Sequence, residues 1–212
     1  MFTCLRHIPK LFAAAAVAAS SVSCGDVVRS GKSPMFLVID QLQARRGGGS
    51  STTLGANLIS DVLTLVTSPA PCTAERPCPT IFNDIGQVTL RSVLKDVGNA
   101  LAQAAPSTNN EITINRFHIV YRRADGRNTP GVDVPYAWDG ASTGTVPIGG
   151  TLVLSFEIVR HAAKQEAPLA ALITSPTIIT TIADITFFGQ DRVGNEISVT
   201  GSIQIDFGNF GD

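Results

Sequence analysis

Apolar and polar residues alternate along most of the chain after residue 35, with the period of two that is typical of β-strands. The clearest case is ISVTGSIQIDF, residues 197–207, where apolar residues occupy the odd positions and polar residues the even ones. Gly201 interrupts the apolar series, and a glycine inside a strand is typical of a bulge or bend. The segment therefore predicts a strand with one face in a core and the other in water, irregular near Gly201.

Other segments show the same pattern. TLVLSFEIV, residues 151–159, alternates throughout. EITINRFHIVYRR, residues 111–123, changes from even to odd apolar positions near Asn115, so we expect either a β-bulge there or a strand covered on both faces. Further apolar runs, bounded by Gly, Pro or Asn, are PMFLVIDQLQA (34–44), LISDVLTLV (58–66), GQVTLRSVL (86–94) and TIADITFFG (181–189).

Helical patterns are scarce in the same region. The one candidate is HAAKQEAPLAALI, residues 161–173, and Pro168 limits it to a short piece because proline breaks a helix interior. Strands without alternating helices indicate an antiparallel sandwich and not a parallel α/β sheet. The sequence therefore predicts an all-β, Greek-key sandwich of about seven to nine strands, forming one domain over residues 35–212 with at most one short helix.

The end of the chain carries a family resemblance. ADITFFGQDRVGNEISVTGSIQIDFGNF, residues 183–210, resembles the closing hairpin of bacterial immunoglobulin-like and fibronectin-like domains. The resemblance implies an immunoglobulin-like sandwich and no particular activity, because functional sites are added to such folds.

The beginning of the chain has a different composition. Arg6 and Lys10 precede an apolar, Ala-rich run that ends at Val22 among small residues, which is the order of a secretory signal peptide. The run is about 12 residues long, whereas a membrane-spanning helix needs about 20. We therefore expect residues 1–23 to direct export and to be removed.

SVSC, residues 21–24, resembles the lipobox of bacterial lipoproteins, with Ser21 where that family prefers Leu. The resemblance implies that Cys24 is acylated and that residues 24–34 tether the domain to a membrane. It also implies the outer membrane, because Gly25 follows the cysteine where an Asp would mark retention at the inner membrane. The open alternative is an ordinary signal peptide in which Cys24 has no role.

Two more cysteines, Cys72 and Cys78, lie in the Pro-rich segment PAPCTAERPCPT. An oxidising compartment favours a disulfide between them. Zinc is the weaker alternative, because a structural zinc site needs four ligands and no histidine lies nearby.

The net charge of the chain bears on whether it binds nucleic acid. The chain has 16 basic and 17 acidic side chains, and removal of residues 1–23 takes away Arg6 and Lys10 and no acid, which leaves a net charge of −3. No basic face is implied, so we do not expect nucleic acid as a partner.

The segment YRRADGRNTPGVDVPYAWDG, residues 121–140, has the densest concentration of functional side chains. A recognition loop would use its ring surfaces for stacking and its guanidinium groups to bind carboxylates. The alternative is a structural connection whose tryptophan caps the core. The residues of this candidate patch are Arg122, Arg123, Arg127, Tyr136 and Trp138.

Catalytic and metal-binding patterns are weak. The segment's three aspartates do not have EF-hand spacing, and His118 and His161 lack an evident third ligand. The chain contains no G-x-S-x-G motif, and its Gly-rich stretch at 47–49 lacks the lysine of a phosphate loop. We therefore expect no cofactor, no metal and no catalytic site.

The sequence favours a non-enzymatic, lipid-anchored envelope protein that binds or scaffolds an envelope protein or a glycan. One alternative is a carbohydrate-binding module, which would expose Trp138 and Tyr136 side by side. The other is a metal-dependent hydrolase, which would join His118 or His161 to two acids.

Overall fold

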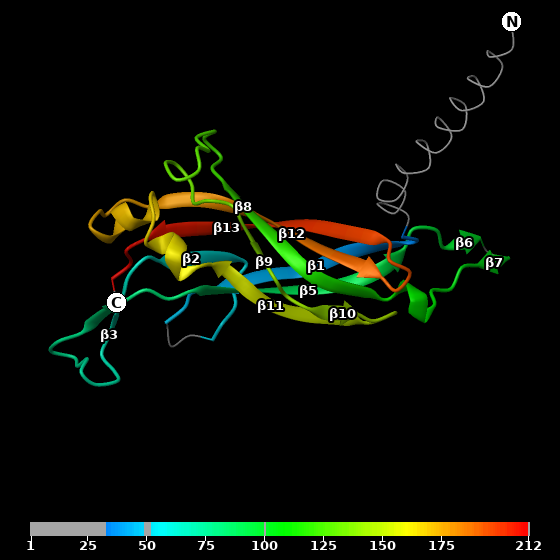
Figure 1. The fold of residues 1–212 in the computed structure, drawn as a ribbon, viewed down its shortest axis with the longest axis horizontal. Helices are drawn as coiled ribbons and strands as arrows, with labels where there is room; N and C mark the ends of the chain where they lie inside the picture. The colour runs from blue at the N-terminus through cyan, green and yellow to red at the C-terminus, as the bar shows by residue number, and fades with distance from the viewer. Residues whose placement is uncertain (1–32, 49–51, 100, 212) are drawn as a thin grey trace, which may run out of the picture.

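The computed structural model describes residues 33–48, 52–99 and 101–211 (Figure 1). The predicted signal peptide, Cys24 and the tether up to residue 32 lie outside the described residues. Among the described residues, no helix is long and apolar enough to cross a membrane.

Two β-sheets pack face to face around one core. The first sheet has three strands, in the order β1 (Met35–Arg45), β5 (Asp84–Leu94) and β11 (Thr151–Val159). The second has six strands: β10 (Gly144–Val146), β8 (Ile112–Arg122), β12 (Ile179–Asp191), β13 (Glu196–Gly208) and β2 (Asn57–Asp61) in that order, with β9 (Trp138–Gly140) paired to β8. The all-β sandwich predicted from the alternating pattern is confirmed.

One strand pair departs from the antiparallel pairing of its sheet. β2 runs parallel to β13, from Asn57 opposite Gln204 to Asp61 opposite Gly208. After β1, the chain turns back to form an isolated bridge between Ala44 and Gly55 before β2 begins. The chain therefore crosses from one sheet to the other to reach β2. Because no hairpin joins β2 to β13, the two strands are free to run parallel.

The change of parity in β8 is a bulge. Phe188 of β12 lies opposite Arg116 and Gly189 lies opposite Ile114, which leaves Asn115 as the additional residue. Ile114 and Phe117, on either side of it, are both buried. One of the two explanations offered by the sequence, a bulged strand, is thus correct.

The irregularity expected at Gly201 does not occur. Its strand keeps continuous register with β12 through Ile185 opposite Gly201. A Cβ atom at Gly201 would lie 2.7 Å from Ile39 Cδ1 and 3.1 Å from Leu42 Cδ2. The glycine therefore makes room for side chains of the opposite sheet.

The centre of the core is aromatic. Phe156 of β11 packs between Phe117 and Phe187 of the second sheet, with ring centroids 5.1 and 5.2 Å apart. Gly86 lies opposite Phe156 in the neighbouring strand, and the ring fills the space that a side chain would need. The two sheets are thus joined by close packing that leaves no room for substitution at Gly86.

The sandwich has two distinct ends (Figure 1). The end where β1 starts also holds the turn between β12 and β13 and a ribbon of β6 (Gly98–Asn99) and β7 (Ala102–Gln103) followed by the 3-10 helix η1 (Thr108–Asn110). We call it the tether end, because the chain enters the sandwich there.

The opposite end, the far end, holds the ribbon of β3 (Thr64–Val66) and β4 (Cys78–Thr80) together with the chain's last described residues. Cys72 and Cys78 form the predicted disulfide in that ribbon. The predicted helix at 161–173 is divided around Pro168 into α2 (His161–Lys164) and the 3-10 helix η2 (Leu169–Ile173).

Candidate binding surfaces

The arginines of the 121–140 segment are already paired. Arg123 and Arg127 both donate to Asp125 Oδ2, with Nη2–Oδ2 distances of 2.8 and 2.9 Å. These guanidinium groups and the backbone N–H of Arg127 lower the pKa of Asp125 well below its usual range. The loop therefore uses two of the three patch cations to hold its own turn.

Arg122 points away from that loop. It lies on the outer face of the second sheet, where its Nε donates to Asp184 Oδ2 at 2.5 Å. Ser202 Oγ donates to the other oxygen of the same carboxylate at 2.5 Å. The third patch arginine is thus part of a cross-strand network over β8, β12 and β13.

Trp138 packs over the core. Its ring makes an edge contact with Phe117 at 5.2 Å between centroids, and the Arg160 guanidinium covers it at 4.7 Å. Its Nε1 donates to Tyr121 Oη at 3.3 Å, and Tyr121 donates to Ile158 O at 2.7 Å. These contacts are those expected of a tryptophan that caps the core.

Tyr136, in contrast, is 53% exposed. Its ring and hydroxyl lie against Gly131, where a Cβ atom would be 2.2 Å from the hydroxyl oxygen. The five patch residues therefore contact different neighbours, and the structure does not gather them around a common centre.

The rings of His118 and His161 each lie beside one polar side chain, and neither arrangement forms a metal site. His118 Nδ1 lies 3.1 Å from Asp139 Oδ1, and His161 Nδ1 lies 3.0 Å from Asn83 Oδ1. Within the described ranges, no group of three or more His, Cys, Asp or Glu side chains could hold a metal ion.

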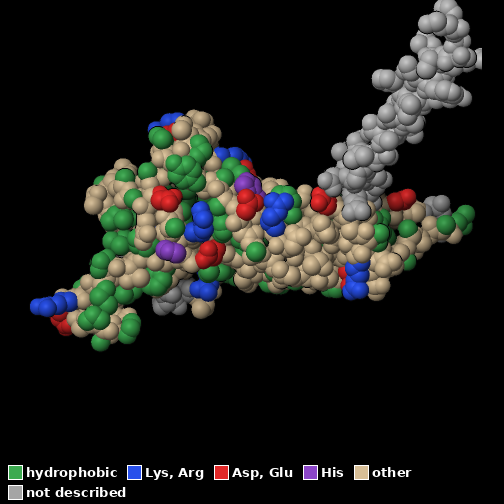
Figure 2. Space-filling model, viewed as in Figure 1, with side chains coloured by type: hydrophobic (Ala, Val, Ile, Leu, Met, Phe, Trp, Pro, Cys, Tyr) green, Lys and Arg blue, Asp and Glu red, His purple; other side chains and the backbone are tan. Residues whose placement is uncertain are grey.

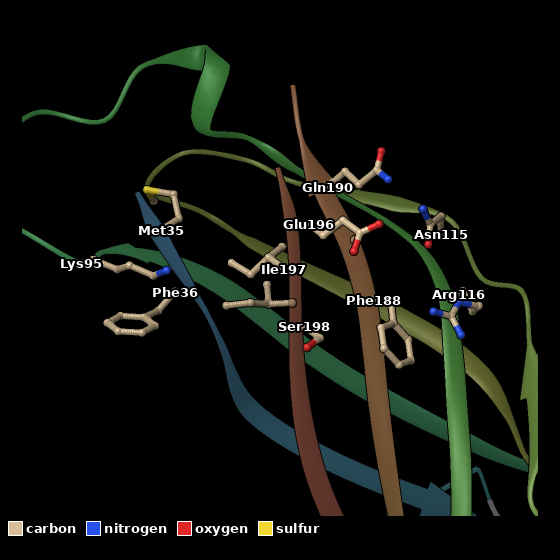
Figure 3. A pocket seen from close by; sticks show the side chains of 12 residues that line it. Met35, Phe36, Lys95, Asn115, Arg116, Phe188, Gln190, Glu196, Ile197 and Ser198 are labelled. Carbon is tan, nitrogen blue, oxygen red and sulfur yellow. The ribbon is translucent and has the colours of Figure 1, made fainter. Parts of the chain in front are cut away.

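A groove lies at the tether end of the sandwich (Figure 3). It has a volume of about 570 Å³, within the usual range of ligand sites. Residues of β1, β8, β12 and β13 line it together with Lys95, just after β5. The lining residues are Met35, Phe36, Leu37, Lys95, Asn115, Arg116, Phe188, Gly189, Gln190, Glu196, Ile197 and Ser198.

Two aromatic rings in the groove each carry a cation. Lys95 Nζ lies 5.2 Å from the centroid of the Phe36 ring, and the Arg116 guanidinium lies 3.8 Å from that of Phe188. Such pairs offer both apolar surface and positive charge. Figure 3 shows them on the two sides of β13, with Glu196 between them at the start of that strand.

The groove lies at one end of an uncovered strip between the two sheets. In the part of the chain that the structure describes, β13 residues 196–203 pair only with β12, because β2 covers only Gln204–Gly208. Residues 35–43 of β1 likewise pair only with β5. We call the strip between these two edges the open seam.

Apolar side chains lie beneath the open seam. Ile197 and Val199 of β13 and Ile39 and Leu42 of β1 pack on the core yet are only partly buried. At the far half, the segment from Gly55 to Asp61 covers the corresponding strip by bridging to Ala44 and pairing with β13. The chain thus covers one half of its seam with a strand and leaves the other half without one, where Ile39 and Leu42 of β1 pack directly against Gly201 of β13.

Sequence reasoning missed the open seam. Alternation identifies the inward residues of β13 but does not reveal which strand lies beside them. The uneven coverage follows from the short parallel β2, for which the sequence carries no signal.

A buried charge cluster at the far end was also missed. Lys164 and Asp84 are both fully buried, with Lys164 Nζ 2.9 Å from Asp84 Oδ2. Ser60 Oγ donates to Asp84 Oδ2 at 2.6 Å, Gly47 N donates to Oδ1 at 2.9 Å, and Lys164 Nζ also donates to Asp61 O at 2.8 Å. Burial raises the pKa of Asp84, and the lysine and the hydrogen-bond donors oppose that rise.

This cluster ties together α2, β2 and β5, with each polar atom directed at another part of the cluster. It lies at the far end, away from the groove, and its geometry is that of a structural ion pair.

No protein-family model matches the chain, and neither a curated protein nor a solved structure matches it.

Proposed function

We propose that the protein is an exported, lipid-anchored protein of the outer membrane that binds an envelope partner without catalytic turnover. The open seam is the proposed binding site, and an extended segment of a partner polypeptide is the proposed ligand. The observation that supports this most directly is the 196–203 edge of β13, which lacks a neighbouring strand in the described structure while β2 occupies the rest of the same edge.

The edge itself favours an extended ligand. An uncovered strand edge presents unpaired N–H and C=O groups that can pair with an added strand. β2 already pairs with this edge in parallel orientation, from Gln204 onward. A ligand strand placed before Asn57 along the same line would continue the ladder that β2 begins.

The side chains beneath the seam indicate the ligand's pattern. Ile197 and Val199 on one edge and Ile39 and Leu42 on the other leave apolar surface partly exposed. A strand directs alternate side chains to one face, so a ligand with apolar residues at every second position would cover this surface. Each fully buried aliphatic side chain would contribute about 1.5–3 kcal/mol.

The groove adds polar contacts at the tether end. Lys95 and Arg116 supply positive charge beside exposed ring surface, and Glu196 supplies a carboxylate. Charged groups at the rim of an interface contribute to orientation and association rate more than to affinity. We expect them to fix the direction of the bound segment.

The anchor supports the same role. Ten extended residues span at most about 35 Å, so a lipid on Cys24 would keep the seam near the bilayer surface. Confinement raises the effective concentration of partners in the same membrane. A moderate-affinity strand contact would then suffice.

The carbohydrate-binding alternative is less favoured. It needs Trp138 and Tyr136 to form a shared platform, whereas Trp138 packs on Phe117 beneath Arg160 and Tyr136 lies against Gly131.

The proposal is tested by site-specific photo-crosslinking of the acylated protein in its own envelope. A photoreactive phenylalanine analogue replaces Ile197, which lines the groove and packs on the core beneath the seam, and a matched control replaces Val153, which is 56% exposed on β11. We expect one defined protein adduct from position 197 and none from position 153. Equal adducts from both positions would contradict a partner site at the seam.

A second pair of variants tests the mode of binding. Val199→Lys places a charge in the seam, whereas Thr200→Lys changes the next residue, which projects from the opposite, exposed face of the same strand. We expect only Val199→Lys to abolish the adduct, with both variants retaining the β-sheet circular dichroism of the parent. Retention of the adduct in Val199→Lys would exclude strand addition.

A further inference from the structure

The tether end carries several large apolar side chains that are exposed. Leu101 is 99% exposed and Val97 is 67% exposed, and both belong to the ribbon of β6 and β7 or its flanks. Val193, in the turn between β12 and β13, is 69% exposed, and Phe36 of β1 is 54% exposed. Figure 2 shows hydrophobic side chains at the tip of this ribbon.

These residues belong to one end of the sandwich by direct contacts. Met35 lies opposite Leu94, and Lys95 N donates to Pro34 O, so the start of β1 lies beside the chain that leads to the ribbon. Arg192 N donates to Asn109 O, which joins the β12–β13 turn to the segment that follows the ribbon. Apolar side chains from three separate segments therefore project at the tether end.

We infer that the tether end lies against the lipid bilayer, with Val97, Leu101 and Val193 entering its interfacial region. The inference rests on the lipid anchor of the proposed function. It adds a second, non-covalent membrane contact and an orientation of the domain.

The length of chain between Cys24 and the sandwich indicates that the surface facing these apolar side chains is the bilayer. Ser33, the first described residue, follows Cys24 by nine positions, and a segment of that length reaches at most about 30 Å. A fatty acid on Cys24 would therefore hold the tether end close to the membrane. Apolar side chains gain free energy when they leave water for the acyl boundary, and a second contact of this kind strengthens an acyl anchor.

The opposite end offers a matched comparison. Leu65 lies on the disulfide-bearing β3–β4 ribbon at the far end and is 46% exposed. Both ends thus have a short ribbon with an exposed leucine, but only one is next to the tether. An orientation set by the bilayer predicts opposite behaviour for the two leucines.

The test uses the full mature protein, with the fatty acid on Cys24 first verified by mass spectrometry. Leu101→Trp and Leu65→Trp variants are reconstituted into phosphatidylethanolamine–phosphatidylglycerol vesicles with and without bromine on the acyl chains. Trp138 is common to both variants and to the parent, so its signal serves as the baseline. Both positions are exposed, so neither substitution disturbs the core.

We expect brominated lipid to reduce the added fluorescence of Leu101→Trp at least twofold and to leave that of Leu65→Trp unchanged. Acylated protein whose Leu101→Trp signal is not quenched would overturn this inference and leave the lipid anchor intact. Quenching at both positions would overturn the orientation. A chain without fatty acid would overturn the anchor itself, and a Leu101→Trp signal that shifts only when an envelope protein is added would assign this end to a protein partner instead.

Discussion

The buried pair of Lys164 and Asp84 provides a quantitative test of how the far end is held together. Lys164 is 1% exposed and Asp84 is 0% exposed, so neither charge can be solvated by water in the folded state. The perturbation is Lys164→Met, which keeps the length of the side chain and removes its charge. It leaves the Asp84 carboxylate with Ser60 and the N–H of Gly47 as donors.

The expected cost is large. Breaking a buried ion pair on one side costs about 3–5 kcal/mol, because the remaining charge stays buried without a counter-charge. Asp84→Asn should cost a similar amount, since it leaves the buried ammonium opposite a neutral amide. The double variant carries neither charge of the pair, and we expect it to be at least about 2 kcal/mol more stable than additivity of the two single changes predicts.

The direction in which the stability of Lys164→Met changes with pH provides an independent test. Burial already raises the pKa of Asp84, and Lys164 opposes that rise, so Lys164→Met moves the pKa further up. A folded-state pKa above the unfolded value means that the folded protein binds the additional proton. The stability of Lys164→Met relative to the parent should therefore recover as the pH falls from 7 through the folded pKa of Asp84 towards its unfolded pKa of about 3.9.

Urea unfolding followed by circular dichroism, for the parent, both single variants and the double variant at pH 7 and pH 5, measures these quantities. A loss of less than about 1 kcal/mol for Lys164→Met would show that water reaches the pair. Additive single and double effects, or a defect that grows at lower pH, would refute the reasoning.

Three further predictions concern the stability of the core and the far ribbon. Gly86→Ala places a Cβ atom 2.5 Å from the Phe156 ring and should cost about 1–3 kcal/mol in urea unfolding; an unchanged midpoint would contradict the packing described. Tyr121→Phe removes the hydroxyl that donates to the buried Ile158 carbonyl at 2.7 Å and should cost about 1–3 kcal/mol, and an equally stable variant would mean that water replaces the bond. Reduction of the Cys72–Cys78 disulfide should lower stability by no more than about 2.5 kcal/mol, because the loop it closes is short; unfolding on addition of dithiothreitol would show that the ribbon supports the whole sandwich.

The strands were predictable wherever one side faces the core. The odd-numbered apolar residues of 197–207 point inward as expected, and Ile203, Ile205 and Phe207 are buried. Ile197 and Val199 are only half-buried, because the seam above them is uncovered. Alternation thus gives the direction of a side chain, while the depth of its burial depends on neighbours that are distant in sequence.

Short elements and long-range contacts were not predictable. β9 and β10 have three residues each, too few for a periodic signal, and β9 lies in the 121–140 segment, which the sequence left open as a recognition loop or a structural connection. Lys164 belongs to a polar-looking stretch typical of a surface helix, yet it pairs with Asp84, 80 positions earlier. Gly201 follows the rule for a bulge, but its real constraint comes from Ile39 and Leu42 on the opposite sheet.

The role of the candidate patch at 121–140 was equally hard to predict from the sequence. A cluster of Arg, Asp and aromatic residues in 121–140 is compatible with recognition or with a self-supporting loop. The pairing of Arg123 and Arg127 with Asp125 and the position of Trp138 over Phe117 can be seen only in three dimensions. The groove and the open seam combine residues from separate strands, so no local motif could have identified them.

Amide hydrogen exchange along β13 in the mature protein tests the open seam most directly. The strand is covered on both sides from Gln204 to Phe207 and only by β12 from Glu196 to Ile203. We expect strong protection at every residue of the covered half. In the uncovered half we expect protection that alternates, with the amides that point away from β12 exchanging at least tenfold faster than those that point towards it. Uniform strong protection along the whole of β13 in the isolated protein would contradict the open seam and the binding mode proposed for it.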